Sequence, residues 1–461
     1  MKNENALQRP VKNDRREIFG WLMYDWANSA FYTTVISVLL GPYLTALAQN
    51  DVGLNGVVFS LGWLGSVTAE SLVPFSLAIS VVSQVLFLPL LGSIADYTHL
   101  KKKMMAFFCY LGVTASSLLF FISGDNYLFG CALMIVANMS FAAANVFYNA
   151  FLVDLTTEDQ RDKISSYGFA TGYLGGVIML AGNLILIESA DSIGLDKAMA
   201  VRISMLAASL WWGLFGLITF TLVRSRNPTK IIPEGKKLVV IGFSELRQTL
   251  KELFRLKYTA LFLIAYLFYN DGIQTVILSS SVFLSQELFV RKGLEIDQAF
   301  LLGIFMLAQI SALVGSLVFE RLARVIGAKY TIIVSLFIWC GIVIFAYAGL
   351  ESRAQAWVLG AFIGLVLGSA QALSRSLYSQ MIPKERESAF FGLYEISEKG
   401  TSWLGNLVFA VVVASTGSYR QAILGLIFFF VVGIVLLIVT NTARAIHEAG
   451  NLTPEEAAEE H

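Results

Sequence analysis

The sequence predicts an all-α integral membrane protein with twelve transmembrane helices arranged as two pseudo-symmetric six-helix bundles. Three observations predict this fold. Of the 461 residues 56% are hydrophobic and only 14% are charged, whereas soluble proteins carry about 25% charged residues. The chain contains twelve long apolar stretches, and its two halves repeat one another. This composition excludes a nucleic-acid-binding protein, a disordered chain and an ordinary cytosolic enzyme.

A transmembrane helix needs about 20 mostly apolar residues, because the bilayer offers its backbone no water to bond. The first predicted span contains Asp25 and lacks a small-residue cleavage site, so it does not resemble a removable signal peptide. The twelve predicted spans cover residues 20–48, 72–95, 103–123, 128–153, 165–187, 200–224, 258–286, 298–318, 329–349, 354–377, 390–414 and 418–440.

The distribution of basic residues predicts the orientation. If the N-terminus is cytoplasmic, all but six of the 33 Lys and Arg residues fall in cytoplasmic loops or at the cytoplasmic ends of spans. Cytoplasmic loops concentrate Lys and Arg. We therefore expect both termini in the cytoplasm. The compact loops are typical of bacterial proteins, so we expect the chain in a cell membrane, most simply the plasma membrane of a bacterium.

The spans divide the chain into five regions. The segment 225–257 carries Arg247, Lys251 and Arg255 at helical spacing, which predicts an amphipathic helix at the membrane interface. We expect the acidic tail to be disordered. The predicted regions are a cytoplasmic segment 1–19, a first bundle 20–224, a cytoplasmic linker 225–257, a second bundle 258–440 and a cytoplasmic tail 441–461.

The first helix of each half carries the clearest internal repeat. The strings YDWANSAF and YNDGIQTV both contain an Asp, then an amide three residues later, then a hydroxyl. Positions i, i+3 and i+4 share one face of a helix, so each half presents one polar patch with a single carboxylate. The matched residues are Asp25, Asn28 and Ser29 in the first half and Asp271, Gln274 and Thr275 in the second.

Several strings resemble those of one transporter family. A G-x-x-x-D motif, Gly92 to Asp96, is followed by three lysines after the second span, as in the major facilitator superfamily. The strings GWLMYDWANSAFYTTV, FYNAFLVDL, GFATGYLGG, FYNDGIQTV and QALSRSLYSQMIPKERESAFFGLYEISEKG resemble the vacuolar-effluxer-like branch of that superfamily. The resemblance implies a secondary transporter of two bundles, and its fungal relatives suggest export of amino acids. Arg324 departs from the pattern, because it replaces the acidic residue expected in the second copy of the loop.

Buried polar side chains mark the expected substrate and ion pathway. A carboxylate in the hydrocarbon region costs several kcal/mol, so Asp25 and Asp271 must face a cavity or a partner. They would couple protons or bind a cationic group; alternatively, each is neutralised by a neighbouring helix. The expected pathway residues are Asp25, Asn28, Tyr32, Asn145, Asn149, Asn270, Asp271, Gln274, Gln371, Glu395 and Lys399.

Glu395 and Lys399 stand at positions i and i+4 of the eleventh span. One interpretation is that they neutralise one another. The other is that Lys399 binds the carboxylate of an amino acid, with the ammonium near Asp271, while Glu395 takes part in proton coupling. The sequence leaves both open.

A second set of residues predicts a cytoplasmic gate. By resemblance, Asp96 pairs with a basic residue or a helix end and latches the cytoplasmic side; alternatively, the lysines only report topology. Arg375 either anchors its helix end or holds a gate against Asp154. The expected gate residues are Gly92, Asp96, Lys101, Asp154 and Arg375.

The expected function is secondary active transport of a small solute by alternating access. No phosphate-binding loop GxxxxGK[ST], cysteine–histidine cluster or catalytic serine motif occurs, so we expect no cofactor, no metal and no enzymatic activity. The driving force would be an ion gradient, most simply protons, and the substrate an amino acid. A sugar, peptide or drug stays open as substrate, as does a non-transporting membrane sensor or scaffold. The expected partners are the solute, protons and the lipid bilayer, without nucleic acid, and the chain is expected to be monomeric.

Overall fold

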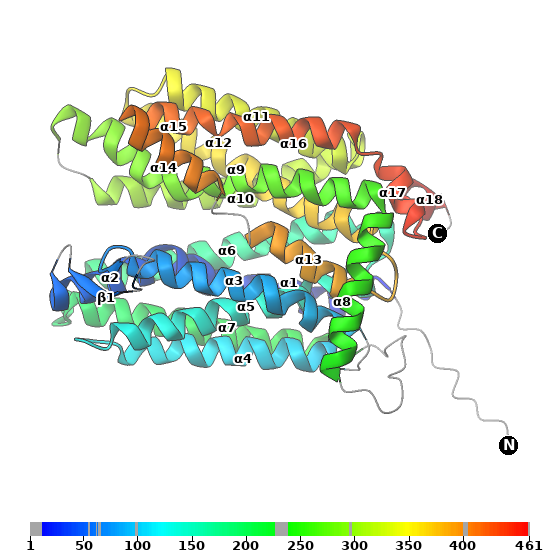
Figure 1. The fold of residues 1–461 in the computed structure, drawn as a ribbon, viewed down its shortest axis with the longest axis horizontal. Helices are drawn as coiled ribbons and strands as arrows, with labels where there is room; N and C mark the ends of the chain where they lie inside the picture. Colours follow the sequence, from blue (N-terminus) through cyan, green and yellow to red (C-terminus); the bar gives the residue numbers. More distant parts are fainter. Residues whose placement is uncertain are drawn as a thin grey trace.

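The computed structural model describes residues 12–53, 56–60, 62, 66–96, 100–225, 238–294, 297–399 and 404–459, without the side chains of 238–241, 298, 299, 399 and 414. Helices dominate these residues, as the apolar stretches predict, and they form two layers (Figure 1). The first layer holds the helices of the N-terminal half, and the second holds most of those of the C-terminal half. The exception is α13 (Glu387–Lys399), which packs on α3 (Leu72–Ala95) of the first layer.

The N-terminal half contains six long helical spans and a short hairpin. The first span is continuous from Arg15 to Val52 and includes a π-helical stretch shortly before Pro42. Its elements are α1 (Arg15–Phe31), η1 (Tyr32–Leu39), α2 (Leu40–Val52), β1 (Val57–Ser60), β2 (Ser66–Thr68), α3 (Leu72–Ala95), α4 (Lys101–Leu118), η3 (Leu119–Phe121), α5 (Tyr127–Leu155), η4 (Glu158–Gln160), α6 (Arg161–Glu188), η5 (Asp191–Ile193) and α7 (Lys197–Leu222).

The C-terminal half follows the linker helix α8 (Leu238–Arg255). The chain ends in two short helices, α17 (Thr442–Glu448) and α18 (Pro454–Glu459). The elements between are α9 (Lys257–Leu288), η6 (Val290–Lys292), α10 (Gln298–Ile326), α11 (Ala328–Ala348), α12 (Arg353–Gln380), α13 (Glu387–Lys399), α14 (Leu404–Thr416), α15 (Tyr419–Gly425) and α16 (Ile427–Val439).

Eleven helices among the described residues are long and apolar enough to cross a membrane. The predicted count of twelve is therefore not confirmed. The difference lies in the predicted span 390–414, where residues 400–403 lie outside the described part of the chain. On either side of them the structure describes two shorter helices, α13 and α14.

The acidic tail is helical where we expected disorder. Thr453 and Glu456 cap α18 reciprocally: the Thr453 backbone N–H donates to Glu456, and the Glu456 N–H donates to Thr453 Oγ1. The Asn451 amide donates to the carbonyls of Gln380 and Ile382, both at 2.8 Å, and ties the tail to the end of α12. The reciprocal cap and the contacts of Asn451 stabilise this short helix despite its acidic composition.

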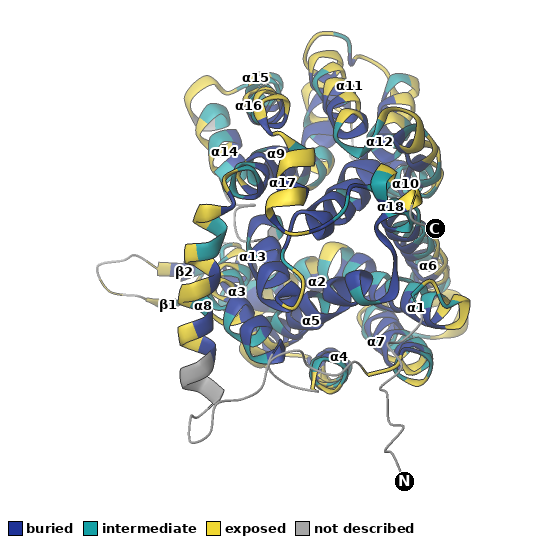
Figure 2. Cartoon of the chain, turned by 90° about the vertical axis from the view of Figure 1, so that its right-hand side faces the viewer, coloured by how far each residue is buried: buried dark blue, intermediate teal, exposed yellow. Residues whose placement is uncertain are grey.

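The two ends of the helical layers differ. One end carries α8, the start of α1 and α17, and we call it the α8 end; the other carries the β1–β2 hairpin (Figure 1). In the view onto the α8 end, buried residues fill the zone between the two layers (Figure 2). There α3 packs on α13, and α6 packs on α10 and α12.

Candidate functional site

Arg375 lies on α12 of the C-terminal half, but its guanidinium bonds to the N-terminal half. Its Nε donates to Ser165 Oγ at 2.9 Å, and its Nη2 donates to the Ser165 carbonyl, also at 2.9 Å. Its Nη1 donates to Asn149 Oδ1 at 3.3 Å. Because only 3% of the residue is exposed, this cation is stabilised by its protein partners rather than by water.

Asp25 on α1 completes this site. Its Oδ2 lies 3.4 Å from Arg375 Nη1 and accepts a hydrogen bond of 2.7 Å from the Tyr148 hydroxyl. A Cβ atom on Gly168 would lie 2.5 Å from the same carboxylate oxygen and 2.9 Å from Arg375 Nη2. A larger residue at this position of α6 would therefore displace the ion pair.

Aromatic rings surround the Arg375 guanidinium. Its Cζ lies 4.4 Å from the ring centre of Phe169, 4.9 Å from that of Trp21 and 5.5 Å from that of Tyr148. Trp21 stacks on Tyr148 and donates its indole N–H to the Tyr148 carbonyl at 2.9 Å. Aromatic rings stabilise a desolvated cation through their negative faces. These three rings therefore stabilise the Arg375 guanidinium where they shield it from water.

Three further predicted pathway residues, two on α5 and one on α12, form hydrogen bonds within and between the halves. Asn149 donates to Glu395 Oε1 on α13 at 2.7 Å, across the two halves. Asn145 accepts from Asn28 at 3.0 Å within the N-terminal half. Gln371 accepts from the Tyr173 hydroxyl at 3.3 Å, again between the halves. Asparagine residues of α5 thus connect both to α1 and to α13.

Tyr32 and Gln274 stand apart from the Arg375 cluster. The Tyr32 ring stacks on Phe141 at a centroid distance of 5.2 Å, and both residues belong to the N-terminal half. Gln274 is half-buried on α9.

Asp271 occupies a different environment from Asp25, although the repeat relates them. Its Oδ2 accepts from the backbone N–H of Gly405 at 2.8 Å, at the start of α14. The neighbouring Asn270 donates to the Glu398 carbonyl at 2.7 Å, near the end of α13. These two side chains of α9 therefore bind backbone groups of both α13 and α14. The side chain of Lys399 lies outside the described part of the structure.

Asp96 lies at the end of α3 and binds the N-terminus of α13 in the other half. Its Oδ1 accepts from the Ser388 N–H at 3.0 Å, and its Oδ2 accepts from the Ala389 N–H at 2.9 Å. A helix N-terminus attracts a carboxylate through its unpaired N–H groups. A Cβ on Gly92 would lie 2.1 Å from the Ser388 carbonyl, so Gly92 allows this close contact.

Burial raises the pKa of the Asp96 carboxyl above its usual value, although Lys101 and the two N–H groups oppose the shift. Burial likewise raises the pKa of Glu387, the first residue of α13. Lys101 pairs with Asp154 at 3.0 Å. Asp154 therefore pairs with Lys101, whereas Arg375 pairs with Asp25.

Sequence reasoning missed a second contact at the α8 end. Arg386, just before α13, pairs with Glu245 at 2.7 Å and also with Glu252, both on α8. The seven-residue spacing of Glu245 and Glu252 places them on one face of α8. That spacing was the available signal, but it did not identify Arg386 as the partner.

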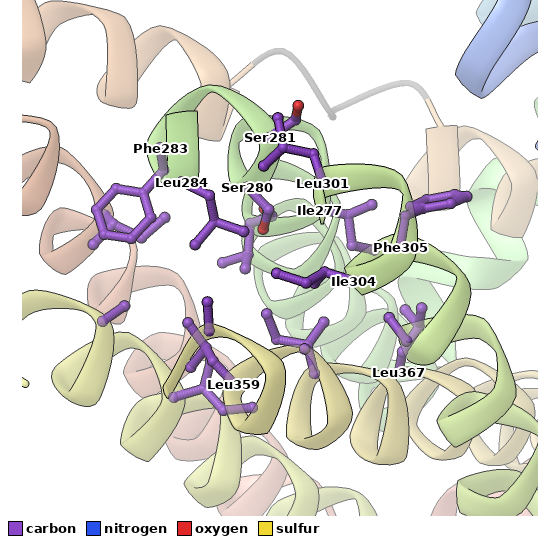
Figure 3. Close-up of a pocket in the computed structure, with 18 of the residues that line it drawn as sticks. Ile277, Ser280, Ser281, Phe283, Leu284, Leu301, Ile304, Phe305, Leu359 and Leu367 are labelled. Atoms are coloured by element: carbon purple, nitrogen blue, oxygen red, sulfur yellow. The ribbon is translucent and has the colours of Figure 1, made fainter. Parts of the chain in front are cut away.

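A cavity of about 110 Å³ lies inside the C-terminal half, between α9, α10, α11 and α12 (Figure 3). Its walls are apolar side chains such as Ile304, Phe305 and Leu359, with Ser280 and Gln309 among the few polar groups. None of the described residues that line it is charged. It is therefore unsuited to a zwitterion. The described residues also contain no group of three His, Cys, Asp or Glu side chains that could hold a metal ion.

The sequence pattern of the family described as "Vacuole effluxer Atg22 like" matches residues 13–450. The chain belongs to this family. It is 33% identical over 429 residues to the uncharacterized MFS-type transporter YxiO of Bacillus subtilis, covering 93% of this chain and 95% of that one. It is 25% identical to autophagy-related protein 22 of Kluyveromyces lactis, covering 95% and 96% of the two chains.

Solved transporters share the fold. The human organic anion transporter MFSD10 matches with a TM-score of 0.62 at 14% identity, over 93% of this chain and 100% of that one. The fucose:proton symporter of E. coli matches with a TM-score of 0.63 at 12% identity, over 93% and 100%. The family match and the 33% identity to an MFS-type transporter make this effluxer-like chain a multi-pass membrane transporter of the major facilitator superfamily, and it is not an enzyme.

Proposed function

We propose that this transporter carries amino acids together with protons by alternating access, and that Asp25 and Arg375 couple the two. The observation that supports the proposal is the buried Asp25–Arg375 ion pair, which joins α1 of one half to α12 of the other. The pathway runs between the halves, and the α8 end is its closed end in this conformation.

Opening the α8 end requires Arg375 to leave Asp25. Separating a buried ion pair leaves two uncompensated charges. Loss of even one partner of such a pair costs about 3–5 kcal/mol. A proton on Asp25 removes one of these charges. A substrate carboxylate on Arg375 compensates the other. Joint binding of a proton and a carboxylate therefore lowers the barrier more than either alone, which is the condition for coupled transport.

An α-amino acid supplies the required carboxylate. In this proposal its carboxylate binds Arg375, and its ammonium faces Glu395, the carboxylate that accepts from Asn149. Asn28, Tyr32, Asn145, Gln274 and Gln371 line the pathway, while Asn270 and Asp271 support α13 and α14, and Lys399 ends α13. The family resemblance to vacuolar effluxers also favours amino acids over sugars.

The proposed gate rests on the contacts at the α8 end, and the proposed location rests on the distribution of basic residues and on the bacterial relative. Gly92, Asp96, Lys101 and Asp154 close the α8 end, which is the cytoplasmic end by the distribution of Lys and Arg. Both termini are then cytoplasmic, and the bacterial relative favours the cell membrane. The chain acts as a monomer, because one chain supplies both halves of the pathway.

Counterflow tests the substrate. Purified protein in liposomes loaded with an unlabelled amino-acid mixture should accumulate labelled amino acids, whereas liposomes loaded with buffer or with sugars should not. Protein that melts cooperatively but shows no counterflow with any amino acid would contradict the amino-acid assignment and direct the assay to other carboxylate solutes.

A further inference from the structure

A groove of about 600 Å³ lies between the two halves and outside the Asp25–Arg375 site. Side chains of α1, α6 and α10 form its walls, and α6 and α10 pack side by side at the edge of the molecule (Figure 2). Three basic side chains, Lys163, Arg321 and Arg324, line one end of it, with one acidic side chain, Glu320. The network that we assign to transport uses none of them.

The groove changes character along its length. Lys163 begins a stretch of α6 that ends at Leu174, and α10 runs from Leu313 at the apolar end to Arg324 at the basic end. Each stretch covers twelve residues, and its eleven steps span about 16 Å at the rise of an α-helix. The basic end lies at the α8 end of the molecule, where α6 begins and α10 ends. The apolar end points toward the membrane interior.

The charges at the basic end do not cancel. Arg324 pairs with Glu320 at 2.5 Å, and the Glu320 side chain is only 3% exposed. Arg324 itself is 54% exposed, so its guanidinium still faces outward. Arg321 is exposed as well, and Lys163 is half-buried beside the ring of Tyr167. The basic end thus keeps two positive charges in excess.

We propose that this groove binds an anionic glycerophospholipid, with its phosphate headgroup at Lys163, Arg321 and Arg324 and an acyl chain along Leu174 and Leu313. A free phosphate matches only the basic end, whereas the apolar walls need a chain attached to the anion. Basic pockets between transmembrane helices at the cytoplasmic side bind anionic headgroups in this way. Since the groove is lined by α6 of one half and α10 of the other, a bound lipid would contact both halves and stabilise their packing here.

Lipid binding to the whole protein tests the proposal. Delipidated protein in detergent is titrated with phosphatidylglycerol, phosphatidylcholine of the same acyl chains, or inorganic phosphate, and bound lipid is counted by native mass spectrometry. We expect one phosphatidylglycerol to bind at least tenfold more tightly than phosphatidylcholine. The variant Lys163→Gln/Arg321→Gln should lose at least tenfold of that affinity, because each basic residue near an anionic group contributes about fivefold.

Lys103→Gln/Lys251→Gln is the matched control, because it removes two exposed positive charges from the same end but outside the groove. It should keep the wild-type affinity, and all three proteins should melt at the same temperature. Equal affinity for both lipids, or an equal loss in the control, would overturn the proposal. Inorganic phosphate that displaces phosphatidylglycerol at millimolar concentration would also overturn it, since the site would then recognise a free anion. The readout does not depend on which solute is transported.

Discussion

Arg375 Nη1 lies 3.4 Å from Asp25 Oδ2, and this contact joins two residues that are 350 positions apart in the chain. The guanidinium also bonds to Ser165 and Asn149, so it keeps partners when Asp25 is neutralised. Asp25 has only Tyr148 as a further hydrogen-bond donor among the contacts described. The two residues of the pair are therefore not equivalent, and substitutions of each should differ in effect.

Arg375→Gln should destabilise the protein more than Asp25→Asn. The first substitution leaves a buried carboxylate without its cation, which costs about 3–5 kcal/mol, whereas the second leaves Arg375 with its other acceptors. The double variant should recover part of the loss, since it removes both charges. Thermal melting in detergent measures all three. Lys197→Gln, which removes an exposed pair with Asp191, serves as the control and should melt like the wild type. Equal melting temperatures for the two single variants would contradict this account.

Gly92→Ala should loosen the closed α8 end. The new Cβ would lie 2.1 Å from the Ser388 carbonyl oxygen. Because this is a backbone atom, it cannot move away as the end of a flexible side chain could. Spin labels at the exposed positions Lys103 and Tyr330, in a background without the native cysteines, report the distance between the halves at this end. We expect a longer distance in the variant. Gly182→Ala is the control, because nothing lies within 4 Å of its added Cβ; a similar lengthening there would show that the label pair does not report this contact.

In protein without substrate, acid should favour closure of the α8 end through Glu387, whereas the proposed opening needs a proton on Asp25 together with a substrate carboxylate on Arg375. Burial raises the pKa of Glu387 in the closed form, whereas a hydrated Glu in the open form keeps a value of about 4.3. The closed form therefore holds the proton more tightly, and closure gains stability as the pH falls from the raised value toward the ordinary one. Asp96, Asp154 and Lys101 face the same group.

The same spin-label pair should report shorter distances as the pH falls, and Glu387→Gln should flatten this dependence. A shift toward longer distances in acid, or an unchanged pH dependence in Glu387→Gln, would contradict the role given to this carboxyl.

Asp271→Ala and Asp271→Asn should separate hydrogen bonding from charge. Asp271 accepts from the backbone N–H of Gly405 in α14, and loss of this acceptor leaves a buried donor unpaired, which costs about 1–3 kcal/mol. Asn keeps an acceptor oxygen, so Asp271→Asn should melt near the wild type while Asp271→Ala melts lower. If both variants melt alike, Asp271 does not act mainly as a hydrogen-bond acceptor.

The fold could be predicted because the bilayer demands long apolar helices, a constraint visible in single segments. The contacts of α13 and α14 with α9 could not, because Asn270 and Asp271 lie more than a hundred residues before the backbone groups of Glu398 and Gly405 that they bind. Sequence spacing carries no information on such distant partners.

The site was predicted as a set of residues, but not as a set of pairs. Asp25, Asn149 and Arg375 were all expected to matter, yet Arg375 was considered only as an anchor or a partner of Asp154. Its contact with Asp25 depends on how α12 packs against α1 and α6, and on the space that Gly168 leaves. Ser165 and Phe169 were missed because a serine and a phenylalanine in an apolar helix are indistinguishable from packing residues.

The most direct test compares two assays on the wild type and Asp25→Asn in the same liposomes: counterflow of a labelled amino acid at equal pH, and its accumulation driven by a pH gradient. The account predicts that Asp25→Asn, a permanent mimic of the protonated state, keeps exchange but loses gradient-driven accumulation. Accumulation at the wild-type level in Asp25→Asn, with the same dependence on the pH gradient, would contradict the claim that Asp25 couples protons to transport.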